Sequence, residues 1–334
     1  MSFFIGRKQF QDLTDSISEK VHNLSDEELF SKVEYDPSGA ERGGYSNYSY
    51  WRSTFRMFLK NRSAAVLLII MLILISFSVI QPLLPNQKNP VEIFNNPETG
   101  LQYRNVPPGE LFFFGSNNIG QDLWSRIWSG TRTSLFIAFT VASWEMVIGI
   151  IIGALWGYVR RLDRIITEIY NVLDNIPTTI TMILFTYIMR PGMWTIIIAL
   201  CLTSWIGMAR FIRNQIIIIR DREYNLASRC LGVGTARVVT KNLLPYLVSV
   251  IMMRVALSIP GTISSEVFLT YIGLGLPVSM PSLGNLLNEG RLRMLSAASR
   301  YQLWFPLVVL SIITISFYVI GNAFADAADP KNHV

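Results

Sequence analysis

Two long stretches without a charged residue constrain this chain more than any other feature. They run from Ser63 to Gln87 and from Tyr301 to Ala325, and each contains 25 residues. A helix of about 20 apolar residues crosses the hydrocarbon core of a bilayer, and a buried helix in a soluble protein rarely needs that length. Only 16% of all residues are charged, against about a quarter in soluble domains. We therefore expect an integral membrane protein.

Four further apolar segments raise the expected number of transmembrane helices to about six and predict an all-α fold. Charged residues interrupt the second and fifth segments, and Pro177 lies inside the third, so five spans or one broken helix are also compatible with the pattern. The predicted spans are about 63–84, 133–158, 166–189, 193–212, 245–267 and 303–325. Gly149, Gly153 and Gly157 recur at every fourth residue of the second span, which predicts close packing against another helix.

The distribution of lysine and arginine predicts the orientation. If the N-terminus is cytoplasmic, 20 of the 29 basic residues lie on the cytoplasmic side and 8 lie outside. Cytoplasmic loops carry an excess of these residues, so we expect both termini inside. Cationic cytoplasmic loops also explain the net charge of +6 without nucleic acid, which is not an expected partner.

The predicted organisation follows from these spans. Ser25–Glu28 has the form of a capping box and predicts a short helix in the N-terminal tail. In the next segment, Phe55 and Phe58 follow Trp51 at helical spacing, which is typical of an amphipathic helix in the membrane interface; the alternative is a cytoplasmic helix packed on protein. The parts are a cytoplasmic tail (1–49), the interfacial helix (50–62), the first transmembrane helix with an extracellular loop (63–132), a core of five transmembrane helices (133–325) with a long cytoplasmic loop (213–244), and a cytoplasmic C-terminal tail (326–334).

Few side chains in this sequence are suited to catalysis or metal binding. The two histidines, His22 and His333, lie near the two ends, and Cys201 and Cys230 lack the spacing of a zinc site or a disulfide framework. The sequence also contains no GxxxxGK[ST] phosphate-binding loop. We therefore predict no catalytic residue, no metal site and no cofactor bound by this chain, so an intramembrane enzyme is a poor alternative.

The long cytoplasmic loop has an interpretable pattern of its own. Residues 226–231 favour a helix, and Gly232 and Gly234 then permit a tight turn. Thr235 is expected to cap a second helix that Pro245 ends at the membrane. Small side chains on this helix–turn–helix would suit docking into a groove of another protein, although the residues alone are also compatible with an ordinary surface loop.

The same loop resembles a motif of known proteins. The spacing Ala227-Ser228-x3-Gly232-x9-Asn242-x-Leu244-Pro245 is similar to the EAA loop of ABC-importer permeases, whose coupling helices lie in a cleft of the cytoplasmic ATPase. Leu226 replaces the leading Glu of that motif. The resemblance implies that the ATPase is contacted by Glu223, Tyr224, Leu226, Ala227, Ser228, Arg229, Leu231, Gly232, Thr235, Leu244 and Pro245.

Three further segments, 114–135, 266–285 and 325–330, resemble peptide-importer permeases, most closely the C-type permease of oligopeptide and dipeptide importers, including the Ami-type branch. The resemblance covers about 50–334. It implies the type I ABC importer permease fold and a multi-pass protein in the plasma membrane of a Gram-positive bacterium. It also implies a peptide substrate and four partners besides membrane lipid: a second homologous permease chain, two ATPase subunits that hold ATP and Mg, and an extracellular lipid-anchored peptide-binding protein.

Charged residues within the predicted spans are candidates for the translocation pathway. Glu145 and Arg254 lie inside spans, where an unpaired charge is costly, so they should pair with each other or face a wet cavity. Glu266, at the end of the fifth span, is a third candidate. Two other functions are compatible with these charges: import of another small solute such as nickel, and secondary transport driven by an ion gradient.

Overall fold

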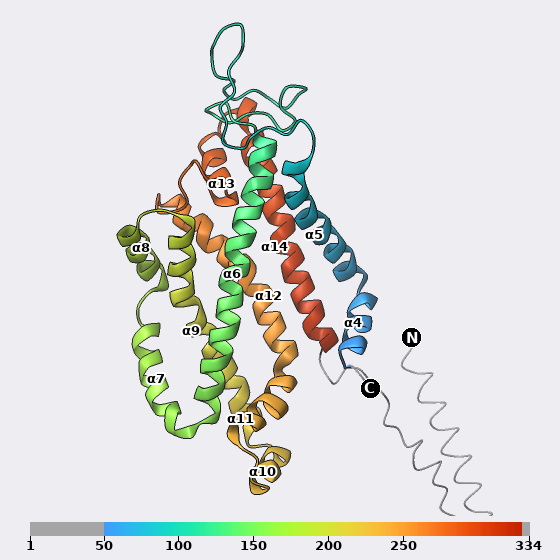
Figure 1. Ribbon diagram of the computed structural model, residues 1–334, viewed down its shortest axis with the longest axis vertical. Coiled ribbons are helices and arrows are strands. Elements are labelled where there is room, and N and C mark those ends of the chain that lie inside the picture. The colour runs from blue at the N-terminus through green and yellow to red at the C-terminus, as the bar shows by residue number, and fades with distance from the viewer. Residues whose placement is uncertain (1–49, 329–334) are drawn as a thin grey trace, which may run out of the picture. The chain divides into compact units, whose positions relative to one another are not determined.

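The computed structural model describes residues 50–328, and side chains from Thr54 onward. The short helix predicted near Ser25 and most of the predicted C-terminal tail lie outside these residues. The described part is helical and contains no strand, only two isolated β-bridges (Figure 1). Its helices are α4 (Tyr50–Lys60), α5 (Arg62–Ile80), α6 (Leu123–Tyr158), α7 (Arg160–Asp174), α8 (Thr178–Met189), α9 (Met193–Arg220), α10 (Glu223–Cys230), α11 (Thr235–Val238), α12 (Leu244–Tyr271), α13 (Leu283–Leu292) and α14 (Tyr301–Ala328).

Five of the described helices, or six with a bent pair, are long and apolar enough to cross a membrane. The five are those that contain α5, α6, α9, α12 and α14, and the bent pair is α7 with α8. The two halves of this pair meet at 74°, and the break falls directly before Pro177. A residue that precedes proline avoids the helical region of backbone conformation, which explains the position of the break. The prediction of an all-α protein with about six spans is confirmed, with the segment predicted as the third span folded as a bent pair of helices.

The second span starts earlier than predicted, at Leu123 instead of 133. Asp122 caps the helix by accepting a hydrogen bond from the backbone N–H of Ser125 at 2.9 Å. Two arginines made this stretch look like a loop, but both are compensated inside the structure. Arg126 forms an ion pair of 2.8 Å with Glu289, and Arg132 donates to the backbone carbonyl of Ser78. Helices α9 and α14 also extend past the predicted ends of their spans, to Arg220 and Ala328.

The glycine repeat brings α6 and α9 together, as predicted. A Cβ atom at Gly149 would lie 2.5 Å from Cγ of Met208, and one at Gly153 would lie 2.5 Å from the carbonyl oxygen of Ala209. At Gly157 the nearest atom would be the carbonyl oxygen of a third α9 residue, 3.0 Å away. The backbones therefore approach more closely than any side chain at these positions would allow.

Helix α4 packs on α14 through one of its sides. The Phe58 ring is buried, and its centroid lies 6.2 Å from that of Phe324. Phe55 and Leu59 are about half exposed. One side of the helix thus packs on protein, as expected for the alternative of a helix packed on protein. The other side is apolar and exposed, as expected for a helix in the membrane interface.

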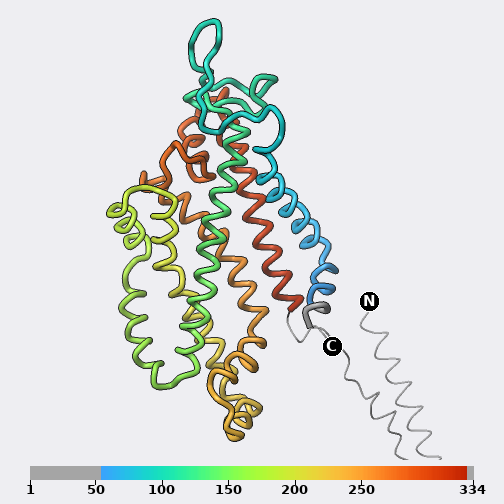
Figure 2. Tube along the Cα trace, in the orientation of Figure 1, coloured from blue at the N-terminus to red at the C-terminus, as the bar shows by residue number. Residues whose placement is uncertain are grey.

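The segment between α5 and α6 lies over the ends of α6, α13 and α14 (Figures 1 and 2). The hydroxyl oxygen of Tyr301 lies 2.8 Å from the carbonyl oxygens of both Val106 and Ser116 and can donate its one proton to either, which ties this segment to α14. Burial lowers the pKa of the Lys88 ammonium, and the nearby Asp122 carboxylate opposes that shift. The segment is therefore held against the helices by buried polar contacts.

Candidate functional site

The loop predicted to be cytoplasmic folds as a helix–turn–helix. Helix α10 begins at Glu223, earlier than the predicted 226, and ends in a turn in which Gly232 has φ of +78°. The backbone N–H groups of Leu231 and Val233 donate to the carbonyls of Ala227 and Ser228 at 3.0 and 3.1 Å. A residue with positive φ directly after a helix is usually glycine, since a Cβ atom is strained there. The predicted turn at Gly232 is thus present.

The second half of the predicted loop differs from the expectation. Thr235 does not cap α11, because Gly234 occupies the cap position and no side-chain hydrogen bond is made there. The second helix also does not end at Pro245. It continues through a π turn, Val239–Leu243, directly into α12. Proline is tolerated in the first turn of a helix, and the wide π turn before it relieves the clash of its ring with the preceding backbone.

Asn225 anchors α10 and was not singled out by the sequence. It is fully buried, and its amide donates to the carbonyl of Ile219 at the end of α9 at 2.8 Å. Its Oδ1 accepts from the amide of Asn242 at 3.3 Å, and that amide also lies 3.3 Å from the Ser228 hydroxyl oxygen. The burial of one residue in an eight-residue helix cannot be read from a short pattern, so no sequence signal identified it. These bonds join α10 to α9 and to the π turn before α12.

Two arginines fix the loop to the C-terminal end of α6. Arg220 donates to the carbonyl of Gly157 at 2.7 Å, and Nε of Arg229 donates to the Tyr158 hydroxyl at 3.1 Å. The Arg229 guanidinium also lies over the Tyr158 ring, 4.9 Å from its centroid. Asp221 interacts with both arginines, at 3.1 and 3.8 Å. The loop is therefore attached to three transmembrane helices, so a displacement of the loop should be transmitted to them.

The loop exposes three large apolar side chains among exposed charged residues. Leu231 is 84% exposed, and Tyr224 and Leu226 are exposed to nearly half of their surface. Exposed apolar patches on soluble surfaces commonly mark interaction sites. The other predicted contact residues divide into exposed Glu223, Ala227, Gly232, Thr235 and Pro245, and partly buried Ser228, Arg229 and Leu244.

Glu145 and Arg254 line one polar cavity of about 350 Å³ between α6, α8, α9 and α12. Glu145 is 6% exposed. In the described part of the chain, the two side chains make no ion pair within 4.0 Å with each other or with any other group. The two side chains thus line one cavity without forming an ion pair, and their place in a translocation pathway stays a prediction.

Glu266 lies apart from this cavity. It is completely buried, and its carboxylate accepts hydrogen bonds from the hydroxyls of Ser282, Thr270 and Ser134 at 2.8, 3.2 and 3.3 Å. A buried carboxylate needs such donors to replace its hydration. A Cβ atom at Gly284 would lie 2.6 Å from Oε1, which explains the absence of a side chain there. Glu266 thus joins α12 to α6 and to the start of α13.

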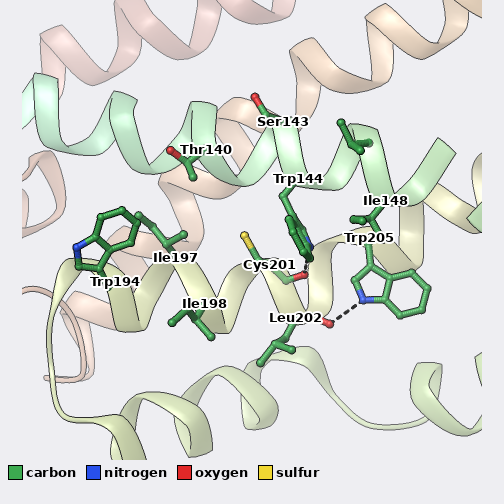
Figure 3. A pocket seen from close by; sticks show the side chains of 11 residues that line it. Thr140, Ser143, Trp144, Ile148, Trp194, Ile197, Ile198, Cys201, Leu202 and Trp205 are labelled. Carbon is green, nitrogen blue, oxygen red and sulfur yellow. Dashed lines mark hydrogen bonds between the residues drawn. The ribbon is translucent and has the colours of Figure 1, made fainter. Parts of the chain in front are cut away.

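A larger hollow of about 640 Å³ lies between α6 and α9 and has an apolar lining (Figure 3). Trp144 donates its indole N–H to the carbonyl of Cys201, and Trp205 donates to the carbonyl of Leu202, each at 3.0 Å. Because these donors are satisfied inside the protein, the hollow offers hydrocarbon surface and little polarity. Its chemistry suits a lipid chain or an apolar helix better than a peptide backbone. Among residues 50–328, no group of three or more His, Cys, Asp or Glu side chains is arranged to hold a metal ion.

Comparison with known proteins gives two matching family models. Residues 145–334 match the binding-protein-dependent transport system inner membrane component, and residues 49–108 match the N-terminal TM domain of oligopeptide transport permease C. The chain is 38% identical to the oligopeptide transport system permease protein AmiD of Streptococcus pneumoniae, over 92% of this chain and 98% of that protein. It is 35% identical to the dipeptide transport system permease protein DppC of Bacillus subtilis, over 95% of this chain and 97% of that one.

A solved structure shares the fold. An inward-facing form of the MetNI methionine ABC transporter aligns with a TM-score of 0.50 and 22% sequence identity. The alignment covers 60% of this chain and 94% of the transporter chain. The helical core described above is therefore the fold of an ABC importer permease.

Proposed function

Because this chain belongs to the family of binding-protein-dependent transport system inner membrane components, we propose that it is a permease subunit of an ATP-driven importer of oligopeptides or dipeptides. The peptide substrate is suggested by the names of its relatives, which are permeases of oligopeptide and dipeptide transport systems. The chain would form half of the translocation pathway in the plasma membrane of a Gram-positive bacterium. It would perform no chemistry itself.

One observation carries the proposed coupling role: the loop 223–243 exposes three large apolar side chains and is anchored behind this surface to three transmembrane helices. Leu231 and Leu226 are exposed, whereas Asn225 and Arg229 bond to the ends of α9 and α6. The π turn continues the loop into α12 without a flexible linker. A partner that binds this surface and moves would therefore move the helices that surround the polar cavity.

The proposed partners supply the functions that this chain would lack, which are ATP hydrolysis, the second half of the pathway and capture of the peptide. Two ATPase subunits, which hold ATP and Mg, would bind the coupling surface from the cytoplasm. A second homologous permease would supply the other half of the pathway, and an extracellular lipid-anchored binding protein would deliver the peptide. Within this chain, Glu145 and Arg254 are the proposed pathway residues, because both line the polar cavity. Glu266 is an expected pathway residue with no contact to that cavity.

Gentle purification of the tagged chain from its native membrane, with identification of bound proteins, tests this proposal. The expected result is a complex with one other permease and two ATPase subunits that takes up radiolabelled peptides in liposomes when ATP and the binding protein are present. A stable lone chain that transports solute with a proton gradient and no ATP would refute the proposal and favour a secondary transporter.

A further inference from the structure

The polar cavity carries two opposite charges that attract each other without forming an ion pair, and Ser258 hydrogen-bonds to Glu145. Arg254 reaches it from the middle of α12, and Glu145 reaches it from α6. Among the described residues, neither makes an ion pair within 4.0 Å. Charges inside transmembrane segments are costly and are kept where they serve a function. Their mutual attraction and the Ser258 hydrogen bond offset only part of that cost, and a ligand with a charge at each end would offset more of it by contacting both residues.

The remaining lining is suited to a peptide backbone. Six hydroxyl side chains surround the two charges: Thr178, Thr203, Ser204, Ser258, Thr262 and Ser265. Thr203 and Ser265 donate their protons to carbonyls of their own helices. Ser258 donates its proton to such a carbonyl or to Glu145. The oxygens of these three hydroxyls therefore remain as acceptors for an amide N–H. The other hydroxyls can donate to a carbonyl as well as accept, and none of these bonds depends on the side chains of a peptide. The hydroxyl of Ser204 is buried and lacks a hydrogen-bond partner in the described part of the chain. The Ser204 hydroxyl can therefore still form a hydrogen bond, and this observation supports a polar ligand independently of the two charges.

The break between α7 and α8 adds a partial positive charge. Thr178 begins α8 and lines the cavity, and the cap residue Pro177 has no side-chain hydrogen bond to the helix. The first N–H groups of a helix have no partner within it and carry the positive end of the helix dipole. Together with the Arg254 guanidinium, they favour an anionic group, whereas Glu145 favours a cationic one.

The size of the cavity selects a short ligand. A sphere of 350 Å³ is about 9 Å across, and an extended dipeptide spans about 7 Å at 3.3–3.6 Å per residue. A dipeptide is therefore short enough to lie in the cavity that Glu145 and Arg254 both line. A single amino acid is too short to use the full cavity, and a longer peptide would have to extend out of it.

We propose that this cavity binds the two charged ends of short zwitterionic peptides, with Glu145 accepting the α-ammonium and Arg254 binding the α-carboxylate. This inference rests on the proposed function and deepens it. It assigns to the permease chain a recognition step that depends on free peptide termini and not on side chains.

Direct binding to the purified importer tests this assignment. The complex of both permeases and both ATPases, without the binding protein, is placed in nanodiscs and titrated with tritiated Ala-Phe. Unlabelled N-acetyl-Ala-Phe and Ala-Phe-amide serve as competitors. Each capped peptide is expected to bind the wild-type complex at least about tenfold more weakly, since each lacks one charged group that forms a strong hydrogen bond.

Substitutions then assign each end to its residue. Glu145→Gln should abolish the discrimination against the N-acetylated peptide but retain the discrimination against the peptide amide. Arg254→Gln should abolish the discrimination against the peptide amide but retain the discrimination against the N-acetylated peptide. Thr140→Val is the matched control, because it removes a hydroxyl from α6 that faces the apolar hollow and bonds to its own helix at 2.7 Å. It should show the wild-type pattern. The ratio of the affinities for free and capped peptide is compared within each variant, because this ratio does not depend on the fraction of folded protein.

Three results would overturn the inference: no binding of Ala-Phe, equal binding of free and capped peptides to the wild-type complex, or wild-type ratios in both charge variants. The first two need no variant, so they decide the question even if a substituted chain fails to fold. ATP-dependent uptake with the binding protein present is measured in parallel. If the importer takes up peptide but does not discriminate against capped peptides, the inference about the cavity is refuted and the proposed function stands. If the importer takes up no peptide, the proposed function is refuted.

Discussion

Replacing Gly232 by glutamate should uncouple the permease from its ATPases without unfolding it. Gly232 lies in the turn between α10 and α11, next to the exposed Leu231. A Cβ atom added there would meet nothing within 4 Å. The new carboxylate would therefore project from the proposed docking surface into the space that the ATPase is expected to occupy.

The cost of this change to folding can be worked out from the backbone. Gly232 has φ of +78°, and an L-residue in that region costs about 1–2 kcal/mol. Gly100 is a matched control: it has φ of +67° and also has no atom within 4 Å of an added Cβ, but it lies in the extracellular segment. Gly100→Glu thus introduces the same charge and about the same backbone strain away from the cytoplasmic surface.

The assay is recovery of the ATPase subunits with the tagged permease, together with the thermal unfolding midpoint of each purified variant. Both variants should insert and should lose similar, small amounts of stability. Only Gly232→Glu should lose the ATPases, and with them peptide uptake. The reasoning is refuted if Gly232→Glu retains the ATPases, or if Gly100→Glu loses them to the same extent.

Three further predictions test contacts between helices, each by one substitution with or without a matched control. Gly153→Ala should lower the free energy of unfolding by about 1–3 kcal/mol, because the added methyl group overpacks against α9. Gly261→Ala is the control: its methyl group meets no atom within 4 Å, so the free energy of unfolding should stay unchanged or rise by up to about 1 kcal/mol. Equal shifts of the thermal unfolding midpoint in the two variants would contradict the close contact of α6 and α9. Glu266→Ala leaves three hydroxyl donors without their acceptor and should cost at least about 2 kcal/mol, more than the isosteric Glu266→Gln, as judged by thermal unfolding. Asn225→Ala should release α10 and increase tryptic cleavage after Arg229, and an unchanged digestion rate would argue against this anchor.

The transmembrane architecture was predictable because it depends on long-range composition. A run of apolar residues is needed to cross the hydrocarbon core, and nothing in the tertiary structure substitutes for it. The break in the predicted third span was also visible, since Pro177 limits the backbone locally. The close approach at Gly149 and Gly153 followed from their spacing.

What the sequence could not supply were contacts between distant residues. Arg126 looked like an extracellular charge because its partner Glu289 lies 163 positions away. The same limit hid two of the three hydroxyls around Glu266, because Ser134 and Ser282 lie 132 and 16 positions away from it. In the loop, Thr235 matched a capping residue, but the backbone placed Gly234 at that position. Local preferences thus indicated the helices, and tertiary partners decided their boundaries.

Site-specific photocrosslinking tests the central claim most directly, that residues 223–243 receive the ATPase. A photoreactive phenylalanine analogue at Leu231, which is 84% exposed, should crosslink to an ATPase subunit in the assembled importer. The same analogue at Leu295, which is 91% exposed and lies in the segment between α13 and α14, should not. Absence of an ATPase crosslink from Leu231 in a complex that contains both ATPases, or equal crosslinking from Leu295, would contradict the account.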